Sequence, residues 1–145
     1  MTENVIDSFV GEYYFLSNFY PCSIEHDGLQ YPSSEHAYQA AKSPSKDKRK
    51  ECLNMTPGQC KKWGRSIGIR YDWDDIKIYV MEQILVTKFS DKILNNLLLE
   101  TYPKELIEGN TWGDTFWGMC NGKGKNNLGK LLIKIRNGYI IDQLF

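Results

Sequence analysis

The stretch that most constrains this chain runs from Asn110 to Gly129 and leads directly into an apolar pattern with helical spacing. It contains two tryptophans, one carboxylate, five glycines and two lysines. The apolar residues that follow share one helix face: Leu128, Leu131, Leu132 and Ile135. A flexible, basic loop that opens a helix favours anion binding, because free N–H groups and the positive end of the helix dipole point at the ligand. Aromatic rings beside it predict that a planar group stacks next to the anion.

An ordinary polar turn is the alternative interpretation of this loop. The segment Gly122-Lys-Gly-Lys-Asn-Asn127 has neither the spacing of a P-loop nor that of a dinucleotide fingerprint. The pairs Trp112-Gly113 and Trp117-Gly118, with Asp114 close by, count against an ordinary turn, because a core tryptophan rarely needs a carboxylate nearby in so flexible a loop.

Composition predicts one globular domain over residues 1–145. The chain of 145 residues is 41% hydrophobic and 25% charged, which is ordinary for a folded domain. Eighteen basic and eighteen acidic residues cancel, so no global field gathers nucleic acid, and any polyanion contact needs a local patch. The charged run 46–51 could touch a phosphate backbone, although a solvated helix face is the commoner reading.

The cysteines predict reduced thiols in a cytoplasmic protein. Four are scattered without a Cys-x-x-Cys pair, and the chain has only two histidines, which argues against structural zinc and against a Cys–His nucleophile. The first residues lack the basic start and apolar run of a signal peptide, and no apolar segment approaches the ~20 residues that cross a bilayer. No metal or cofactor is expected, and the oligomeric state is not indicated.

The order of patterns predicts an α+β domain that is mainly helical with a few short strands. Strands do not alternate with helices as parallel crossovers require, so no doubly wound sheet is expected. The expected elements are a strand and aromatic loop over 8–20, a hairpin of 22–26 and 29–31 turned by Asp27-Gly28, helices over 34–42, 46–51, 56–68, 72–89 (the longest), 91–102 and 126–137 (ended by Gly138), and short strands near 105–108 and Phe116.

Glu35 is a second carboxylate of interest. A lone first-turn glutamate more often complements the helix dipole. On a helix that starts at Ser34, however, a carboxylate, a planar group and a cation share one face, as in the wall of a polar pocket: Glu35, Tyr38 or Gln39, and Lys42. His36 points about 100° away on such a helix and is expected to support the core.

Several stretches together resemble the NADAR (YbiA-like) family, in the family's order, from roughly Phe9 to Arg136. They are Phe15-Leu-Ser-Asn-Phe19, Tyr31-Pro-Ser-Ser-Glu-His-Ala-Tyr-Gln-Ala-Ala-Lys42, Trp63-Gly-Arg65, Trp73, Trp112-Gly-Asp114 and Gly122-Lys-Gly-Lys-Asn-Asn-Leu-Gly129. Their combination is far more specific than any single piece. After Asp114 this chain has Thr-Phe-Trp-Gly-Met-Cys where some relatives have a shorter glycine-rich link, and this loop could shape the base pocket.

The resemblance implies an N-glycosidase that hydrolyses the bond between ribose C1′ and a nitrogen in a phosphorylated nucleoside-type substrate. One branch of the family hydrolyses riboflavin-pathway intermediates, and another removes ADP-ribose from guanine in nucleic acid. By position, the residues that match the family's functional set are Glu35, Trp73, Trp112 and Asp114, with Asn18 and Asn127 as further candidates.

This chemistry gives the candidate residues roles. Breaking a C1′–N bond builds positive charge on the sugar, which one carboxylate can stabilise while a second activates water. Glu35 is the expected base or cation stabiliser and Asp114 its partner across the pocket, with exchangeable roles. The expected substrate-binding residues are Asn18, Phe19, Lys42, Trp73, Trp112, Gly113, Lys123 and Asn127. The aromatic ones would stack on the base, and lysines with the 122–127 amides would hold the phosphate.

Two other classes of function remain open. A module that binds ADP-ribose or a nucleotide without cleaving it would carry the same aromatic and anion-binding features. The carboxylate pair separates the two hypotheses, because a binder needs no acids near an anomeric carbon. A structural protein, for example of a virus, fits least well with polar residues clustered at helix starts and in the glycine-rich loop.

Overall fold

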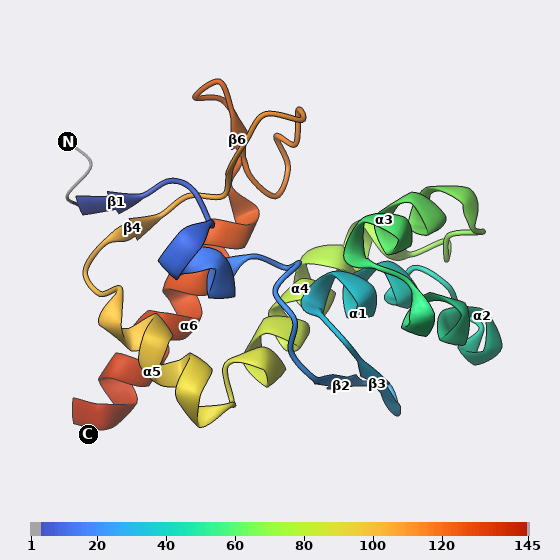
Figure 1. Cartoon of the computed structure of the whole chain (residues 1–145), viewed down its shortest axis with the longest axis horizontal. Coiled ribbons are helices and arrows are strands. Elements are labelled where there is room, and N and C mark those ends of the chain that lie inside the picture. Colours follow the sequence, from blue (N-terminus) through green and yellow to red (C-terminus); the bar gives the residue numbers. More distant parts are fainter. Residues whose placement is uncertain (1–3, 145) are drawn as a thin grey trace. The chain divides into compact units, whose positions relative to one another are not determined.

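A computed structural model describes residues 4–144 (Figure 1). The chain divides into two compact units, which are described separately. The central unit is Asn18–Lys88, and the terminal unit combines the chain up to Ser17 with the chain from Phe89 onward. Most regular structure is helical and every sheet has two short strands, as the α+β, mainly helical prediction requires. Across residues 4–144, no helix has both the length and the apolar character that a membrane span requires.

The central unit begins with the predicted hairpin. Strands β2 (Ile24–His26) and β3 (Leu29–Tyr31) pair in antiparallel register. The turn residues Asp27 and Gly28 have φ angles of 48° and 83°, the left-handed conformation that two-residue hairpin turns need. The hairpin leads into α1 (Ser34–Ala41) (Figure 1).

Helix α1 forms the centre of this unit. The Ser33 hydroxyl caps it by accepting the backbone N–H of His36, and all eight residues of the helix are buried. The imidazole of His36 accepts from Ser33 Oγ through Nδ1 (2.6 Å) and donates from Nε2 to the Met55 carbonyl (2.7 Å). His36 is therefore the core-supporting histidine that its position predicts.

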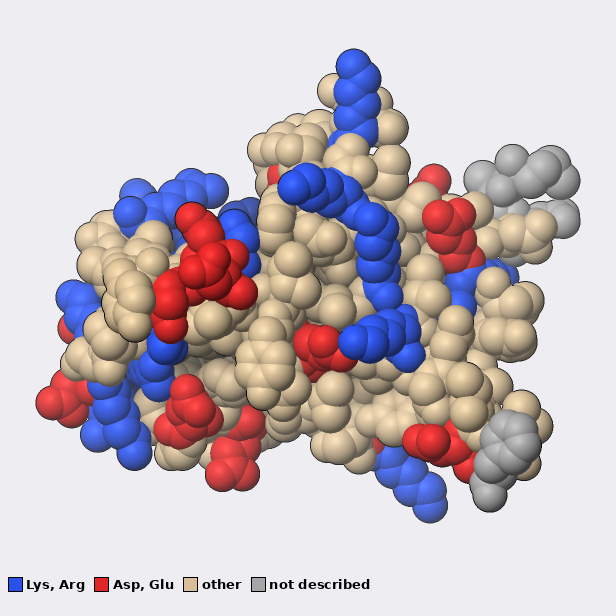
Figure 2. All heavy atoms as spheres, turned by 180° about the vertical axis from the view of Figure 1, so that it is seen from behind, with Lys and Arg blue, Asp and Glu red and all other residues tan. Residues whose placement is uncertain are grey.

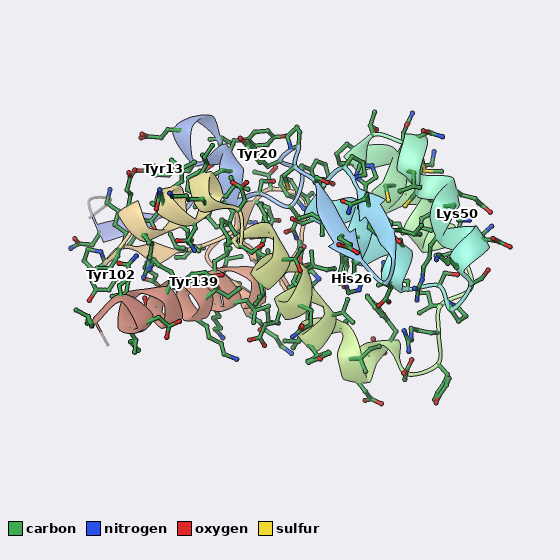
Figure 3. All side chains as sticks on the ribbon, turned by 90° about the horizontal axis from the view of Figure 1, so that it is seen from below. Tyr13, Tyr20, His26, Lys50, Tyr102 and Tyr139 are labelled. Carbon is green, nitrogen blue, oxygen red and sulfur yellow. The ribbon has the colours of Figure 1, made fainter. Side chains whose placement is uncertain are left out.

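Helical segments surround α1 in the central unit. They are α2 (Lys46–Lys50), the 3-10 helix η3 (Glu51–Asn54), α3 (Pro57–Ser66) and α4 (Trp73–Lys88), all of which contact α1. Helix α3 begins as its Thr-Pro start predicts, with Thr56 as the cap and Pro57 in the first turn, and Gln59 completes a capping box that was not predicted. Helix α2 has no fully buried residue, and its Lys50 lies at the outer end of the unit (Figure 3).

The terminal unit joins segments from the two ends of the chain. Strand β1 (Val5–Ile6) pairs in parallel with β4 (Glu105–Leu106), and β5 (Gly109–Asn110) pairs in parallel with β6 (Met119–Cys120). The 3-10 helix η2 (Gly11–Leu16), α5 (Lys92–Glu100) and α6 (Asn127–Leu144) complete the unit. Buried Arg136 of α6 donates to Thr101 Oγ1 (3.1 Å) and to the Lys104 carbonyl (2.7 Å), which fixes α6 to the end of α5.

Three predicted elements differ from the structure. The strand expected over 8–20 is replaced by η2, and the strand lies earlier, at Val5–Ile6. The strand expected near Phe116 is irregular chain between β5 and β6. Helix α6 continues through Gly138 to Leu144 and so exceeds α4 in length. A glycine inside a helix costs only about 1 kcal/mol, which need not stop a helix held by its buried face.

Lys88, the last residue of α4, is a buried cation. Only 1% of its surface is exposed, and its Nζ lies 5.8 Å from the ring centre of Tyr20, which is labelled in Figure 3. Burial lowers the pKa of Lys88 to about 8, and the interaction with nearby Cys22 opposes this shift. The charged form is therefore less stable in the folded protein than in the unfolded chain.

Replacing Lys88 with methionine should stabilise the fold below pH 8. There Lys88 is charged in both states, and the lowered pKa corresponds to about 3 kcal/mol at about 1.4 kcal/mol per pKa unit. As pH rises from 8 toward 10.5 the folded state loses its proton first, so the advantage of Lys88→Met should shrink. Urea unfolding at pH 7, 8.5 and 10 measures the difference in unfolding free energy between Lys88→Met and the parent. Lys92→Met, at an exposed position of α5, is the control. A difference that is constant with pH would contradict a buried charge at Lys88.

Candidate active site

Glu35 is a fixed, buried carboxylate in the first turn of α1. Its residue surface is 7% exposed, and its backbone N–H donates to the Asn18 carbonyl (2.9 Å). One turn later Gln39 donates its Nε2 to Glu35 Oε2 (2.6 Å). Glu35 is therefore more than a solvated partner of the helix dipole, because the carboxylate is both buried and held by a specific donor.

An aromatic pair and a cation lie on the same helix or next to it. The rings of Tyr38 and Trp73 have centres 5.1 Å apart and are tilted by 52°. Lys42 Nζ lies 5.6 Å from the ring centre of Tyr38. Burial lowers the pKa of Lys42, and the negative charge of Glu35 opposes this shift. The predicted stripe of carboxylate, planar group and cation is thus present on α1.

Two further cations near Lys42 were not predicted as site residues. The charges of Arg65 from α3 and Lys77 from α4 both lower the pKa of Lys42, so three helices bring positive charge to this region. Lys77 also pairs with exposed Asp74 (3.2 Å). Only Arg65 had a sequence signal, as part of Trp63-Gly-Arg65, because the grouping depends on helix packing.

Three buried polar atoms close to Glu35 in the chain or in space have no hydrogen-bond partner within residues 4–144. They are Asn18 Oδ1, Ser34 Oγ and Gln39 Oε1. A buried polar atom without a partner costs about 1–3 kcal/mol, and functional sites tolerate this cost where a ligand supplies the partner. Asn18 Nδ2 lies 3.7 Å from Met81 Sδ, and Phe19 beside it is half-buried.

Asp114 organises the loop of the terminal unit. Asn110 holds it by accepting the Asp114 N–H at Oδ1 (3.0 Å) and donating from Nδ2 to its carbonyl (2.9 Å). Asp114 Oδ1 in turn accepts the N–H groups of Phe116 (3.1 Å) and Trp117 (2.9 Å). One carboxylate oxygen therefore has a structural role, and the prediction had not anticipated Asn110.

Four of the six amides in 122–127 that were expected to hold an anion donate within the loop instead. Carbonyls of residues 115–118 fold back over the start of α6 and accept from the N–H groups of Lys125, Asn126, Asn127 and Leu128 (2.8–3.2 Å). The N–H of Lys123 donates to Cys120. The start of α6 is thus capped by its own loop, so the side chains of Lys123 and Lys125, both exposed, are the remaining cationic groups there.

The predicted site residues fall into two groups, one in each unit. Asn18, Phe19, Glu35, Lys42 and Trp73 belong to the central unit, where contacts link Glu35 to Asn18 and Tyr38 to both Lys42 and Trp73. The other group lies in or beside the terminal unit's loop: Trp112, Gly113, Asp114, Lys123 and Asn127. Trp112 is 63% exposed there.

Comparison with known proteins places nearly the whole chain in one family. A NADAR domain matches residues 8–138. N-glycosidase YbiA of Shigella boydii serotype 4 (strain Sb227) is 38% identical over 137 residues, which cover 91% of this chain and 85% of that protein. N-glycosidase Npun_R5314 of Nostoc punctiforme is 35% identical over 129 residues, covering 83% of this chain and 82% of that protein.

A longer relative and a solved structure extend the comparison. Riboflavin biosynthesis protein VVA0006 of Vibrio vulnificus (strain YJ016) is 37% identical over 132 residues, which cover 84% of this chain and 34% of that protein. The NMR structure of the E. coli protein YbiA has a TM-score of 0.84 and 35% identity, covering 99% of this chain and 90% of that chain. This similarity confirms the mainly helical fold with short strands. The chain therefore belongs to the NADAR family, with YbiA-like N-glycosidases as its relatives.

Proposed function

We propose that this N-glycosidase hydrolyses the C1′–N bond of a phosphorylated ribosyl substrate, and that the reaction depends on Glu35. The observation that carries the proposal is the buried Glu35 carboxylate, held by Gln39 on the helix that also presents Lys42 and Tyr38. A module that only binds nucleotides has no need of a desolvated carboxylate in this place.

The chemistry of C1′–N cleavage suits a carboxylate of this kind. As the nitrogen leaves, positive charge grows on the ribose, and an adjacent carboxylate stabilises it more strongly in a buried site than in water. Water then attacks C1′, and its proton passes to a carboxylate acting as base. Glu35 takes one of these roles and Asp114 is the candidate for the other, in either order. The nitrogen of the leaving nucleobase takes up a proton as the C1′–N bond breaks.

Substrate contacts follow from charge and shape. Lys42, with Arg65 and Lys77 near it, provides the positive charge that a phosphate group seeks. The tilted Tyr38–Trp73 pair is buried in the central unit and is a candidate for the wall of the site, whereas Trp112 provides an exposed ring in the terminal unit. Aromatic surfaces of this kind stack on planar bases.

Two substrate classes are supported by different observations. Relatives such as VVA0006 are named as riboflavin biosynthesis proteins, which favours a phosphorylated pyrimidine riboside of that pathway. ADP-ribosylated guanine in nucleic acid is the second candidate. It is favoured by exposed lysines on the loop and on α6: Lys123, Lys125, Lys130 and Lys134. Figure 2 shows a run of Lys and Arg side chains on one face, with Asp and Glu side chains beside it. Such a run of positive charge can bind a phosphate backbone.

Replacing either carboxylate should slow hydrolysis strongly while the protein still binds its substrate. The parent, Glu35→Gln and Asp114→Asn are incubated in parallel with the phosphorylated pyrimidine riboside and with DNA that carries ADP-ribosylated guanine. Chromatography then measures release of the free base, ribose phosphate or ADP-ribose. We expect kcat to fall on the order of 100-fold or more in each variant, because transition-state stabilisation is lost, while substrate affinity stays near the parent value.

A second variant at Asp114 separates chemistry from folding. Asparagine retains an oxygen that can accept the N–H groups of Phe116 and Trp117, whereas Asp114→Ala loses both contacts. Asp114→Asn should therefore lose activity at nearly parental stability, and Asp114→Ala should also lose about 1 kcal/mol of unfolding free energy. Hydrolysis that survives both Glu35→Gln and Asp114→Asn contradicts the assignment. Binding without turnover in the parent would favour the non-catalytic module.

The α6 lysines should matter only for a nucleic-acid substrate. Lys130→Gln with Lys134→Gln removes two exposed charges from α6. We expect weaker binding of ADP-ribosylated DNA. The slope of log Kd against the logarithm of the salt concentration should also fall, by the amount that about two phosphate contacts contribute. Hydrolysis of the small riboside should be unchanged, and Lys92→Gln on α5 is the matched control. Equal effects on both substrates would contradict a backbone-binding role.

A further inference from the structure

Gln39 joins the Glu35 carboxylate on α1 to Gly64 on α3. Its surface is 4% exposed, and its Nε2 donates to Glu35 Oε2 over 2.6 Å. An ionised carboxylate only accepts hydrogen bonds, so the Gln39 carboxamide must present its nitrogen to Glu35. The amide oxygen Oε1 consequently lies in the same plane on the opposite side of the Cγ–Cδ bond axis, facing away from Glu35.

Gly64 occupies the position that this oxygen faces. A Cβ atom added at Gly64 would overlap Gln39 Oε1 and would lie 2.9 Å from Gln39 Cδ. Gly64 is buried within α3, and α3 packs on α1. The helical backbone at this position does not itself require glycine, and glycine is disfavoured relative to alanine inside a helix. The missing side chain therefore leaves space for the Gln39 carboxamide.

The environment of Gln39 fixes one orientation of the carboxamide. Within residues 4–144 Oε1 has no hydrogen-bond partner, so no donor competes with Glu35 for the direction in which the group points. Glu35 attracts the nitrogen, and the absence of a side chain at Gly64 leaves the oxygen its place on the opposite side. This gives a role to the glycine of the Trp63-Gly64-Arg65 stretch, since Gly64 faces the residue that donates to the Glu35 carboxylate.

We propose that Gln39 is a positioning residue that holds the Glu35 carboxylate in one orientation, and that Gly64 is required because it makes room for Gln39. The inference rests on the proposed role of Glu35 in hydrolysis. A carboxylate that loses this donor can rotate away from C1′, which weakens transition-state stabilisation more than substrate binding.

Steady-state kinetics test the role in catalysis. Gln39→Met retains the length of the side chain and removes the donor, and Gly64→Ala forces the carboxamide to move. Each should lower kcat on the order of 10- to 100-fold, with KM within about twofold of the parent. Gln83→Met, on an exposed position of α4, is the matched control and should match the parent.

A double-mutant cycle tests whether Gly64 acts through Gln39. In a Gln39→Ala background the shortened side chain leaves room for a Cβ at position 64, so adding Gly64→Ala should lower kcat no further. Losses that multiply would show that Gly64 acts independently of Gln39. They would overturn this half of the proposal.

Thermal unfolding provides a readout that does not need activity. Gln39→Met should lower Tm by several degrees in the parent, where it removes the Gln39 donor from a buried carboxylate, and by much less in a Glu35→Leu background. Equal Tm changes in the two backgrounds, or parental kcat in Gln39→Met, would overturn the positioning role. If the parent hydrolyses neither substrate, the proposed function fails, and the Tm cycle still decides whether Gln39 holds Glu35.

Discussion

The complete burial of α1 is the constraint on which the central unit depends. A helix surrounded on all sides must be narrow, and Ala37, Ala40 and Ala41 provide small side chains for close contact. Polar groups buried with it are costly unless they find partners inside the protein. Ser34 Oγ and Gln39 Oε1 have none within residues 4–144, but the polar groups of two other residues find them. His36 does so through Ser33 and Met55, and Glu35 does so through Gln39. The same packing that builds the core therefore also desolvates and orients the candidate catalytic carboxylate.

The two candidate carboxylates are held in contrasting ways. Glu35 lies on a rigid helix, and a side chain from the next turn of that helix binds it. Asp114 lies in a loop, where Asn110 fixes its backbone and one of its oxygens fixes the following residues. Preorganisation reduces the cost of reorganising charged groups during reaction, and each arrangement achieves it with local hydrogen bonds.

Local signals in the sequence were sufficient for much of the fold and for part of the site. The Asp27-Gly28 turn, the Thr56 cap and the stripe from Glu35 to Lys42 each depend on neighbours within a few residues. The predictions failed where distant contacts decide. Capture of the α6 amides by residues 115–118 was not visible in a glycine-rich pattern, and Gln39 meets Gly64 only because α1 packs on α3. Helix α6 likewise continues past Gly138, although a glycine at this position predicts the end of the helix.

Buried Asn126, at the end of the glycine-rich loop, has a φ of 51° and accepts the Glu108 N–H while donating to the Leu106 carbonyl. Together with Asn110, it closes the loop at its base next to β4 and β5. The segment between these two asparagines is also tied down in its middle, because β6 pairs with β5 and the carbonyls of residues 115–118 bind the first amides of α6. A loop clamped at both ends and in the middle has little conformational freedom left to lose when it meets a ligand, which lowers the entropic cost of binding.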